Sequence, residues 1–271
     1  MPSARLKKLL QRTLIYGSLL YIALCGDALF FADSLIFQPH RSSYRDSPGI
    51  IKIATRNGRK ISAVYLPNNS GRFTLLVSHG NAEDLGDIRP WLDDMHDAGF
   101  SVLAYDYEGY GTSQGKPSEK AAYEDEIAAY DFLAIRLGTP PDRIIIFGRS
   151  VGTGPAVQLA TIRPAAALVL QSPFLSAFRV LTRIPVFPFD PFPNYRRISH
   201  VHCPLLIMHG TKDSVINIRH GKKLFELANE PKQFVAVEGA DHNDFSPSVT
   251  RAYNQALVNF TSRLEPHASQ Y

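Results

Sequence analysis

The stretch that decides the fold is Ile144-Ile145-Ile146-Phe147-Gly148-Arg149-Ser150-Val151-Gly152-Thr153-Gly154-Pro155. An apolar, β-branched run ends at a Gly-x-Ser-x-Gly, and the residues that follow it favour a helix. The pattern therefore predicts a strand, a sharp turn and a helix. A side chain at Gly148 or Gly152 would collide with the neighbouring strand or helix, so the glycines leave Ser150 at the tip of the turn.

This turn gives Ser150 a setting that suits a nucleophile. It places the backbone N–H of Val151 at a helix N-terminus, where partial positive charge stabilises a developing oxyanion. Pro155 falls in the opening turn of the helix, where a missing N–H costs little. The short motif also arises by chance, so the residues downstream decide its meaning.

Length and composition indicate one folded domain behind an N-terminal segment. The chain has 271 residues, of which 45% are hydrophobic, and this is enough for one large core. The formal net charge is +4, and no basic stripe is interleaved with aromatic residues, so nucleic acid is not an expected partner. Cys25 and Cys203 form no metal-ligand cluster, and neither a metal nor a cofactor motif is present, so neither kind of group is expected.

The N-terminal segment, residues 1–38, is open to three interpretations. Basic residues precede an uncharged apolar run at 13–26, and apolar character resumes after Asp27 as far as Phe37. A single-pass anchor that extends through Asp27, a cleaved signal sequence, and a helix that lies on the membrane or on the protein all fit this pattern. If the segment spans, its basic residues place Met1 in the cytoplasm. We expect membrane attachment, and a soluble, active domain when residues 1–38 are deleted.

Residues 39–265 alternate between strand and helix patterns. Strands are expected at 50–54, 60–65, 73–78, 101–105, 143–147, 167–171, 205–208 and 233–237, with helices after the third, fourth, fifth and last of them. The turn signal Asn57-Gly58 predicts an antiparallel hairpin between the first two strands. The alternation predicts an α/β fold with a mostly parallel sheet covered on both faces. In such sheets, ligands bind at the carboxyl ends of the strands.

Two loops at that edge supply partners for Ser150. A serine needs a base at neutral pH, and the base needs an orienting carboxylate. Asp213 follows the strand at 205–208 and His242 follows the strand at 233–237, while Asp241 and Asp244 are alternative carboxylates beside the histidine. The chain order serine, aspartate, histidine is that of α/β hydrolases and differs from the orders in chymotrypsin-like and subtilisin-like proteases.

Several motifs together resemble the serine hydrolases of the α/β-hydrolase superfamily. They are His79-Gly80-Asn81-Ala82, Asp106-Tyr107 with Gly109-Tyr110-Gly111, Gly148-Arg149-Ser150-Val151-Gly152, His209-Gly210-Thr211 with Asp213, and Gly239 with His242-Asn243-Asp244. The resemblance extends over about residues 38–262 and includes membrane-attached hydrolases such as the eukaryotic protein depalmitoylases and their bacterial relatives. Glu108 departs from the small or basic residue usual before Gly109.

The resemblance implies a fold and a set of roles. The fold is an α/β-hydrolase fold, an eight-stranded, mostly parallel sheet with helices on both faces and a short cap. Ser150 would be the nucleophile, Asp213 the acid and His242 the base. The backbone N–H groups of Asn81 and Val151 would form the oxyanion hole.

The cap is expected as an insertion at about residues 173–200, rich in phenylalanine and proline. Its rings fit two interpretations. They could form an apolar lip for an acyl chain, with Phe174, Phe178 and Phe187 as substrate contacts, or they could anchor the loop onto the body of the domain.

These observations predict a serine hydrolase that cleaves an ester or thioester with an apolar acyl group through an acyl-enzyme. The substrate would be a small molecule or an acylated protein. An amidase or serine aminopeptidase is the alternative on the same fold, because the triad is indifferent to the leaving group. A non-catalytic, membrane-tethered binding protein on a hydrolase scaffold is the alternative from a different class.

Overall fold

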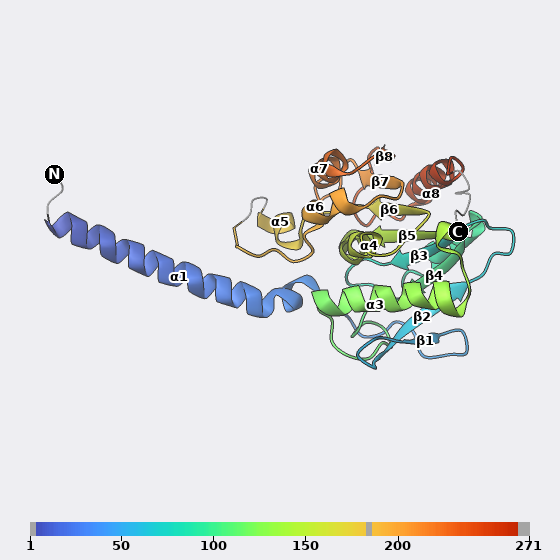
Figure 1. Ribbon diagram of the computed structural model, residues 1–271, viewed down its shortest axis with the longest axis horizontal. Coiled ribbons are helices and arrows are strands. Elements are labelled where there is room, and N and C mark those ends of the chain that lie inside the picture. Colours follow the sequence, from blue (N-terminus) through green and yellow to red (C-terminus); the bar gives the residue numbers. More distant parts are fainter. Residues whose placement is uncertain (1–3, 183–185, 265–271) are drawn as a thin grey trace.

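The computed structural model describes residues 4–182 and 186–264 and has one eight-stranded sheet, in the order β1-β2-β4-β3-β5-β6-β7-β8 (Figure 1). The strands are β1 (Ile51–Ala54), β2 (Lys60–Leu66), β3 (Thr74–Ser78), β4 (Ser101–Tyr105), β5 (Ile144–Arg149), β6 (Ala167–Gln171), β7 (Leu205–Gly210) and β8 (Lys232–Val237). β2 pairs antiparallel with β1 and β4, and the other neighbours are parallel. The predicted α/β fold and its eight-stranded, mostly parallel sheet are confirmed.

Helices cover both faces of the sheet. The helices of the domain are α2 (Arg89–Asp97), α3 (Glu119–Asp131), α4 (Thr153–Ala160), α5 (Ala177–Thr182), α6 (Asn194–Arg197), α7 (Arg219–Leu227) and α8 (Pro247–Thr261). α3, α4 and α7 contribute to one buried apolar cluster, and α2 and α8 to the other. Alternate side chains of β5 enter the two clusters, as the period of a strand requires: Ile144 and Ile146 face one, Ile145 and Phe147 the other.

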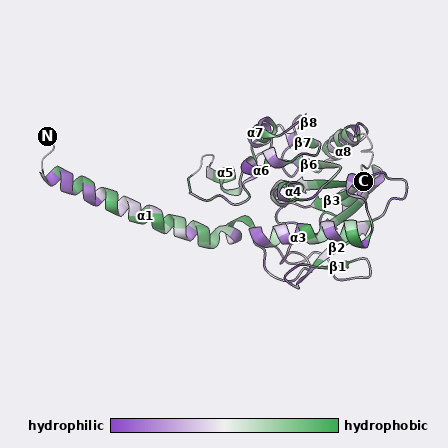
Figure 2. Ribbon diagram, in the orientation of Figure 1, coloured by the Kyte–Doolittle hydropathy of each residue, from purple (hydrophilic) through white to green (hydrophobic). Residues whose placement is uncertain are grey.

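The N-terminal helix α1 (Ala4–Ile36) projects away from the domain (Figure 1). Its length and composition would allow Arg5–Ile36 to cross a membrane, with a mean hydropathy of 1.8 and no buried residue in the apolar window. Figure 2 shows hydrophobic colouring along most of the helix. A spanning anchor and a signal sequence both pass this test. A helix packed along the body of the domain does not fit it, because the apolar window is unburied; away from its last turns, α1 meets the cap through a hydrogen bond from the Tyr21 hydroxyl to the carbonyl of Val186.

Those last turns are part of the domain's packing. Phe37 is 4% exposed, and its ring lies 5.9 Å from that of Phe192 and 6.4 Å from that of Tyr110, measured between centroids. The carboxylate of Asp33 accepts a hydrogen bond from the N–H of Glu119 at the start of α3, at 3.0 Å. The domain boundary expected after residue 38 therefore falls inside packed structure, and the folded unit begins near Asp33.

Candidate active site

Ser150 occupies the sharp turn between β5 and α4. Its φ of 53° lies in the left-handed region, which is strained for a residue with a side chain. A Cβ added to Gly148 would lie 2.5 Å from the carbonyl oxygen of Gly152, and one added to Gly152 would lie 2.1 Å from that of Ser78. Both contacts are too short for any larger residue, which is the steric reason that the sequence pattern anticipated.

Three buried side chains meet at this turn. Nε2 of His242 lies 2.9 Å from Oγ of Ser150, and Nδ1 of the same ring lies 2.8 Å from Oδ2 of Asp213. The residues come from loops after β5, β7 and β8, so the sheet edge brings them together as predicted from the chain order. The distances suit proton transfer from the hydroxyl to the imidazole, with the carboxylate orienting the ring.

The Asp213 carboxylate is held in its ionised form. Burial alone would raise its pKa, but hydrogen bonds from His209 and His242 and from the N–H of Ile216 hold the pKa well below its usual range. The Ile216 N–H donates to Oδ1 at 2.7 Å. An ionised Asp213 favours a proton on Nδ1 of His242, which leaves Nε2 free to accept the proton of the Ser150 hydroxyl.

The alternative carboxylates have other contacts. Oδ1 of Asp241 accepts hydrogen bonds from the N–H and hydroxyl of Ser214 and from the backbone N–H of His242, at 2.7 to 2.8 Å. Asp244 accepts from the N–H of Ser246. Asp241 thus joins the two loops that carry Asp213 and His242, but the carboxylate that contacts the imidazole is Asp213.

The loop after β3 carries Asn81, whose side chain is tied to the end of α1. Its amide Nδ2 donates to the carbonyl of Ile36 at 2.6 Å, while Oδ1 accepts from the N–H of Gln38 at 3.0 Å and from the hydroxyl of Tyr110 at 2.5 Å. Within residues 4–182 and 186–264, no hydrogen bond uses the backbone N–H of Asn81. The side chain therefore fixes the loop while that N–H is left for another acceptor.

This connection leads to a prediction about truncation. Deleting residues 1–28 should leave a soluble, active domain, whereas deleting residues 1–38 should lower both Tm and kcat. The longer deletion removes Phe37 from the core, a loss of about 3 kcal/mol, and removes the partners of Asn81, so kcat should fall at least about tenfold. Thermal unfolding and hydrolysis of a water-soluble ester measure the two effects. Equal activity of the two proteins would show that the end of α1 does not position the Asn81 loop.

Arg149, the residue before Ser150 in the Gly-x-Ser-x-Gly, connects three loops and was not anticipated as a site residue. Its side chain is 3% exposed. Nη1 lies 2.8 and 2.9 Å from the carboxylate oxygens of Glu83, and Nη2 donates to the carbonyl of His242 at 3.1 Å and to Oδ1 of Asn243 at 2.9 Å. Glu83 in turn accepts from the N–H of Gly80. The only sequence signal was a charged residue at the end of an apolar strand.

His79 and Asp106 shape the turns next to the site. His79 is fully buried, with Nδ1 2.7 Å from the carbonyl of Gly80 and Nε2 3.3 Å from Asp106. Asp106 also accepts from the N–H of Leu85. Glu108, the departure from the family pattern, is buried and paired with Arg59, so its charge is balanced inside the protein.

The cap phenylalanines fall into two groups. Phe174 and Phe192 are buried in the main core, where Phe192 covers Gly154 of α4. Phe178 and Phe187 lie with Phe189 in a separate group, with ring centroids 5.5 to 6.1 Å apart. Phe174 and Phe192 therefore anchor the segment onto the domain, whereas substrate contact by Phe178 and Phe187 stays a prediction.

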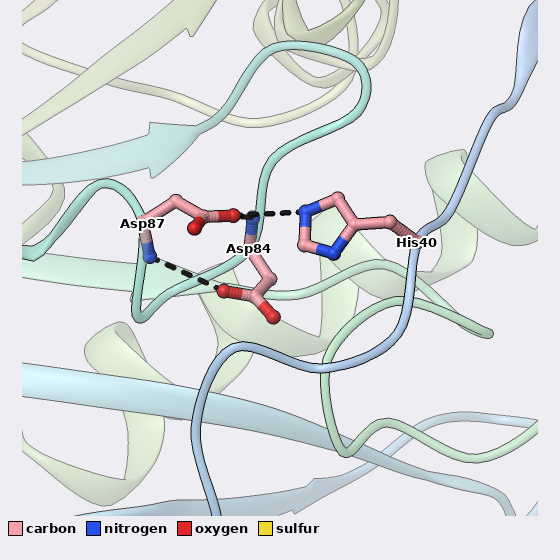
Figure 3. A group of neighbouring side chains, drawn as sticks. All are labelled: His40, Asp84 and Asp87. Atoms are coloured by element: carbon pink, nitrogen blue, oxygen red, sulfur yellow. Dashed lines mark hydrogen bonds and ion pairs between the residues drawn. The ribbon is translucent and has the colours of Figure 1, made fainter.

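A cluster of His40, Asp84 and Asp87 has the residue types of a metal site (Figure 3). Nε2 of His40 lies 2.8 Å from Oδ2 of Asp87. The Asp84 carboxylate accepts hydrogen bonds from the N–H groups of Ser43, Gly86 and Asp87. These contacts explain why the three residues lie together: they hold the segment after α1 against the loop before α2.

Comparisons of the sequence with known proteins agree with the fold and the site described above. Residues 70–186 match the family described as serine aminopeptidase, S33. The chain is 40% identical over 235 residues to alpha/beta hydrolase domain-containing protein 17B of Homo sapiens, covering 83% of this chain and 78% of that protein. The protein of the same name in Xenopus tropicalis is 41% identical over 216 residues, covering 76% and 73%.

Solved structures support the fold. An esterase of Pyrococcus furiosus superimposes with a TM-score of 0.69 at 18% identity, covering 84% of this chain and 99% of that one. Together, the sheet order, the site at its carboxyl edge and the extent of the sequence match lead to one conclusion. The chain is a hydrolase of the α/β-hydrolase superfamily and belongs to the family of the alpha/beta hydrolase domain-containing 17 proteins.

Proposed function

We propose that the protein is a membrane-attached serine hydrolase that cleaves an ester or thioester with an apolar acyl group. The observation that carries the proposal is the continuous contact from Ser150 through His242 to Asp213, with both distances below 3 Å. α1 supports membrane attachment by its length and hydropathy. The substrate is a small molecule or an acylated protein.

In the proposed mechanism, His242 takes the hydroxyl proton of Ser150 as Oγ attacks the carbonyl carbon of the substrate. The N–H groups of Asn81 and Val151 stabilise the oxyanion that forms. Collapse of this intermediate breaks the bond to the leaving alcohol or thiol, which receives the proton from His242, and an acyl-enzyme remains. Water then attacks the acyl carbonyl while His242 accepts its proton, and the acid is released from Ser150.

Two features support an apolar acyl group. The sequence resembles hydrolases that include the protein depalmitoylases, and the Phe178, Phe187 and Phe189 rings of the cap pack against one another as an apolar group. In this proposal Phe178 and Phe187 contact the acyl chain, and Phe174 supports them from the core.

A second candidate is an amidase or aminopeptidase, which the match to the serine aminopeptidase family favours. The same three side chains serve amide cleavage, so the substrate and not the triad distinguishes the two activities. A non-catalytic binding protein is less well supported, because Ser150, His242 and Asp213 are all present and in contact.

A fluorophosphonate probe tests the nucleophile. The wild-type protein should be labelled at Ser150, and Ser150→Ala should abolish labelling. Ser172→Ala is a matched control, because Ser172 is also buried, also has a positive φ and follows the neighbouring strand β6. Labelling that persists in Ser150→Ala, or that is lost only in Ser172→Ala, would refute the assignment. Rates on p-nitrophenyl esters, acyl thioesters and aminoacyl amides then distinguish the substrate classes.

A further inference from the structure

The loop that carries Asn81 lies beside the chain that follows β4. β3 and β4 are parallel neighbours with Ser78 opposite Tyr105, so both chains leave the sheet at the same edge. We define the oxyanion loop as residues 78–82, after the role proposed for the N–H of Asn81. Three tyrosines at the end of β4 and beyond it place their hydroxyls against this loop: Tyr105, Tyr107 and Tyr110.

The first two tyrosines hold the beginning of the oxyanion loop. The hydroxyl of Tyr105 lies 2.8 Å from Oγ of Ser78, and Oγ of Ser78 donates to Oε1 of Glu126 on α3 at 2.9 Å. Because Ser78 has a single hydroxyl proton, Tyr105 is the donor in its contact with Ser78. The hydroxyl of Tyr107 donates to the backbone carbonyl of His79 at 2.8 Å.

A tight turn brings the third tyrosine to the far part of the oxyanion loop. The N–H of Tyr110 donates to the carbonyl of Tyr107 at 2.9 Å, and Gly109 within this turn has a φ of 82°, which a glycine adopts without strain. The Tyr110 hydroxyl thereby reaches Oδ1 of Asn81. The loop is therefore held at three positions, two through side chains and one through its backbone.

The three tyrosines form a rigid set of donors. Each is at most 1% exposed. The ring centroids of Tyr105 and Tyr107 lie 5.5 Å apart and those of Tyr107 and Tyr110 lie 5.6 Å apart, both in edge-to-face contact. Burial raises the pKa of each phenol above its ordinary value, so the hydroxyls keep their protons.

The oxyanion loop in turn packs against the turn that carries the nucleophile. A Cβ added to Gly152 would lie 2.1 Å from the carbonyl oxygen of Ser78 and 2.7 Å from that of His79. The proposed oxyanion hole takes one N–H from each side of this contact. A shift of the loop would therefore change the geometry of the hole even if Ser150 stayed in place.

We propose that Tyr105, Tyr107 and Tyr110 are positioning residues for the oxyanion hole, which hold the loop so that the N–H of Asn81 meets the developing oxyanion. The proposal rests on the serine hydrolase function proposed above. The three hydroxyls act through the loop and not on the substrate. Their removal should therefore lower kcat while KM changes little, because the interaction that is lost strengthens only in the transition state.

Tyr107→Phe tests the proposal, because it removes one hydroxyl and keeps the ring. With the carbonyl of His79 released, kcat on a water-soluble ester should fall by about tenfold, while KM changes by less than about twofold. Tyr130→Phe is the matched control. Tyr130 is also buried, and its hydroxyl donates to a carbonyl, that of Pro164, at 2.6 Å and at the opposite edge of the sheet. Each substitution should lower Tm by about 2–4 °C, but only Tyr107→Phe should lower kcat.

Hydrogen exchange gives a second readout that does not depend on catalysis. In Tyr107→Phe, the amides of the oxyanion loop should exchange about tenfold faster than in the wild-type protein, because the loop opens more often. In Tyr130→Phe, the same amides should exchange at the wild-type rate. Mass spectrometry of peptides that cover residues 78–82 measures both.

Several outcomes would overturn the proposal. They are an unchanged kcat in Tyr107→Phe, an equal loss of kcat in both variants, a rise in KM that accounts for the whole loss of kcat/KM, or unchanged exchange of the oxyanion loop in Tyr107→Phe. The wild-type protein keeps the two levels apart. If it neither hydrolyses the ester nor is labelled at Ser150, the proposed function is refuted and this proposal with it, whereas any of the outcomes above in an active, labelled protein refutes the positioning role alone.

Discussion

In Asp213→Asn protein, kcat should fall by about four orders of magnitude while the fold is retained. The substituted amide cannot hold the proton on Nδ1 of His242, and its own N–H group faces that nitrogen, so Nε2 no longer accepts the Ser150 proton. His242→Ala should lower kcat at least as much, because it removes the proposed base. The three side chains act as a unit, so the double variant should be barely slower than the slower single variant.

Asp241→Asn is the matched control for this experiment. The substitution keeps an oxygen that can accept from Ser214 and from the N–H of His242, so kcat should change by less than about tenfold. Steady-state kinetics on one soluble ester, with thermal unfolding to verify the fold, compare all four variants. Clearly additive losses in the double variant, or a large loss in Asp241→Asn, would show that another residue supplies the base or the carboxylate.

Arg149→Met should lower both the stability of the protein and its kcat, and the two effects can be measured separately. Removing one partner of a buried ion pair leaves Glu83 unpaired and should lower the free energy of unfolding by about 3–5 kcal/mol. The same change also frees the carbonyl of His242 and the loop of Gly80, so kcat should fall by about a hundredfold as both parts of the site lose their positions. KM should change less, because neither loop position supplies most of the ground-state binding.

Three further variants separate charge balance from positioning. Arg149→Met with Glu83→Gln should recover most of the stability, because no unpaired charge remains, yet kcat should stay low. Arg149→Lys should keep the contact to Glu83 but lose the two-sided bridge to His242 and Asn243, since an ammonium group lacks the planar fork of a guanidinium. Arg89→Met, which breaks the exposed pair with Asp93, should have little effect. Unchanged kcat in Arg149→Met would restrict Arg149 to a stabilising role.

The central layer of the fold could be predicted because its signals are local. Apolar strand runs, the glycines around Ser150 and the turn at Asn57-Gly58 each depend on neighbours in the chain, and the predicted strand limits differ from those in the structure by only one or two residues. Asp213 and His242 could be named because the carboxyl ends of parallel strands meet at one edge. The chain order of the three residues matches the order of the strands that carry them, so residues distant in sequence could be predicted to lie in contact.

The remaining features depend on contacts between residues that are distant in sequence, and no local sequence pattern indicates such contacts. α7 was not anticipated, because few of its residues are buried: Gly221 and Leu224 face the sheet and basic residues occupy the rest of its surface. The Arg149 to Glu83 pair joins residues from two different loops, and either residue alone resembles an ordinary surface charge. The side chain of Asn81 had no visible partner, because its partners at Ile36 and Gln38 are in a segment expected to be outside the domain.

The hydrogen bonds between the end of α1 and Asn81 divide the N-terminal segment into two parts. One part, the joint, is fixed to the domain, and the part upstream of it, the tether, is replaceable. Residues from about Asp33 onward are built into the hydrolase, while farther upstream Tyr21 is joined to the cap by its hydrogen bond to Val186. A different attaching device placed before Leu29, such as another spanning helix or a segment bearing a lipid chain, should therefore support the same chemistry. Evolution could change where this enzyme resides by replacing the tether, provided that the joint is kept.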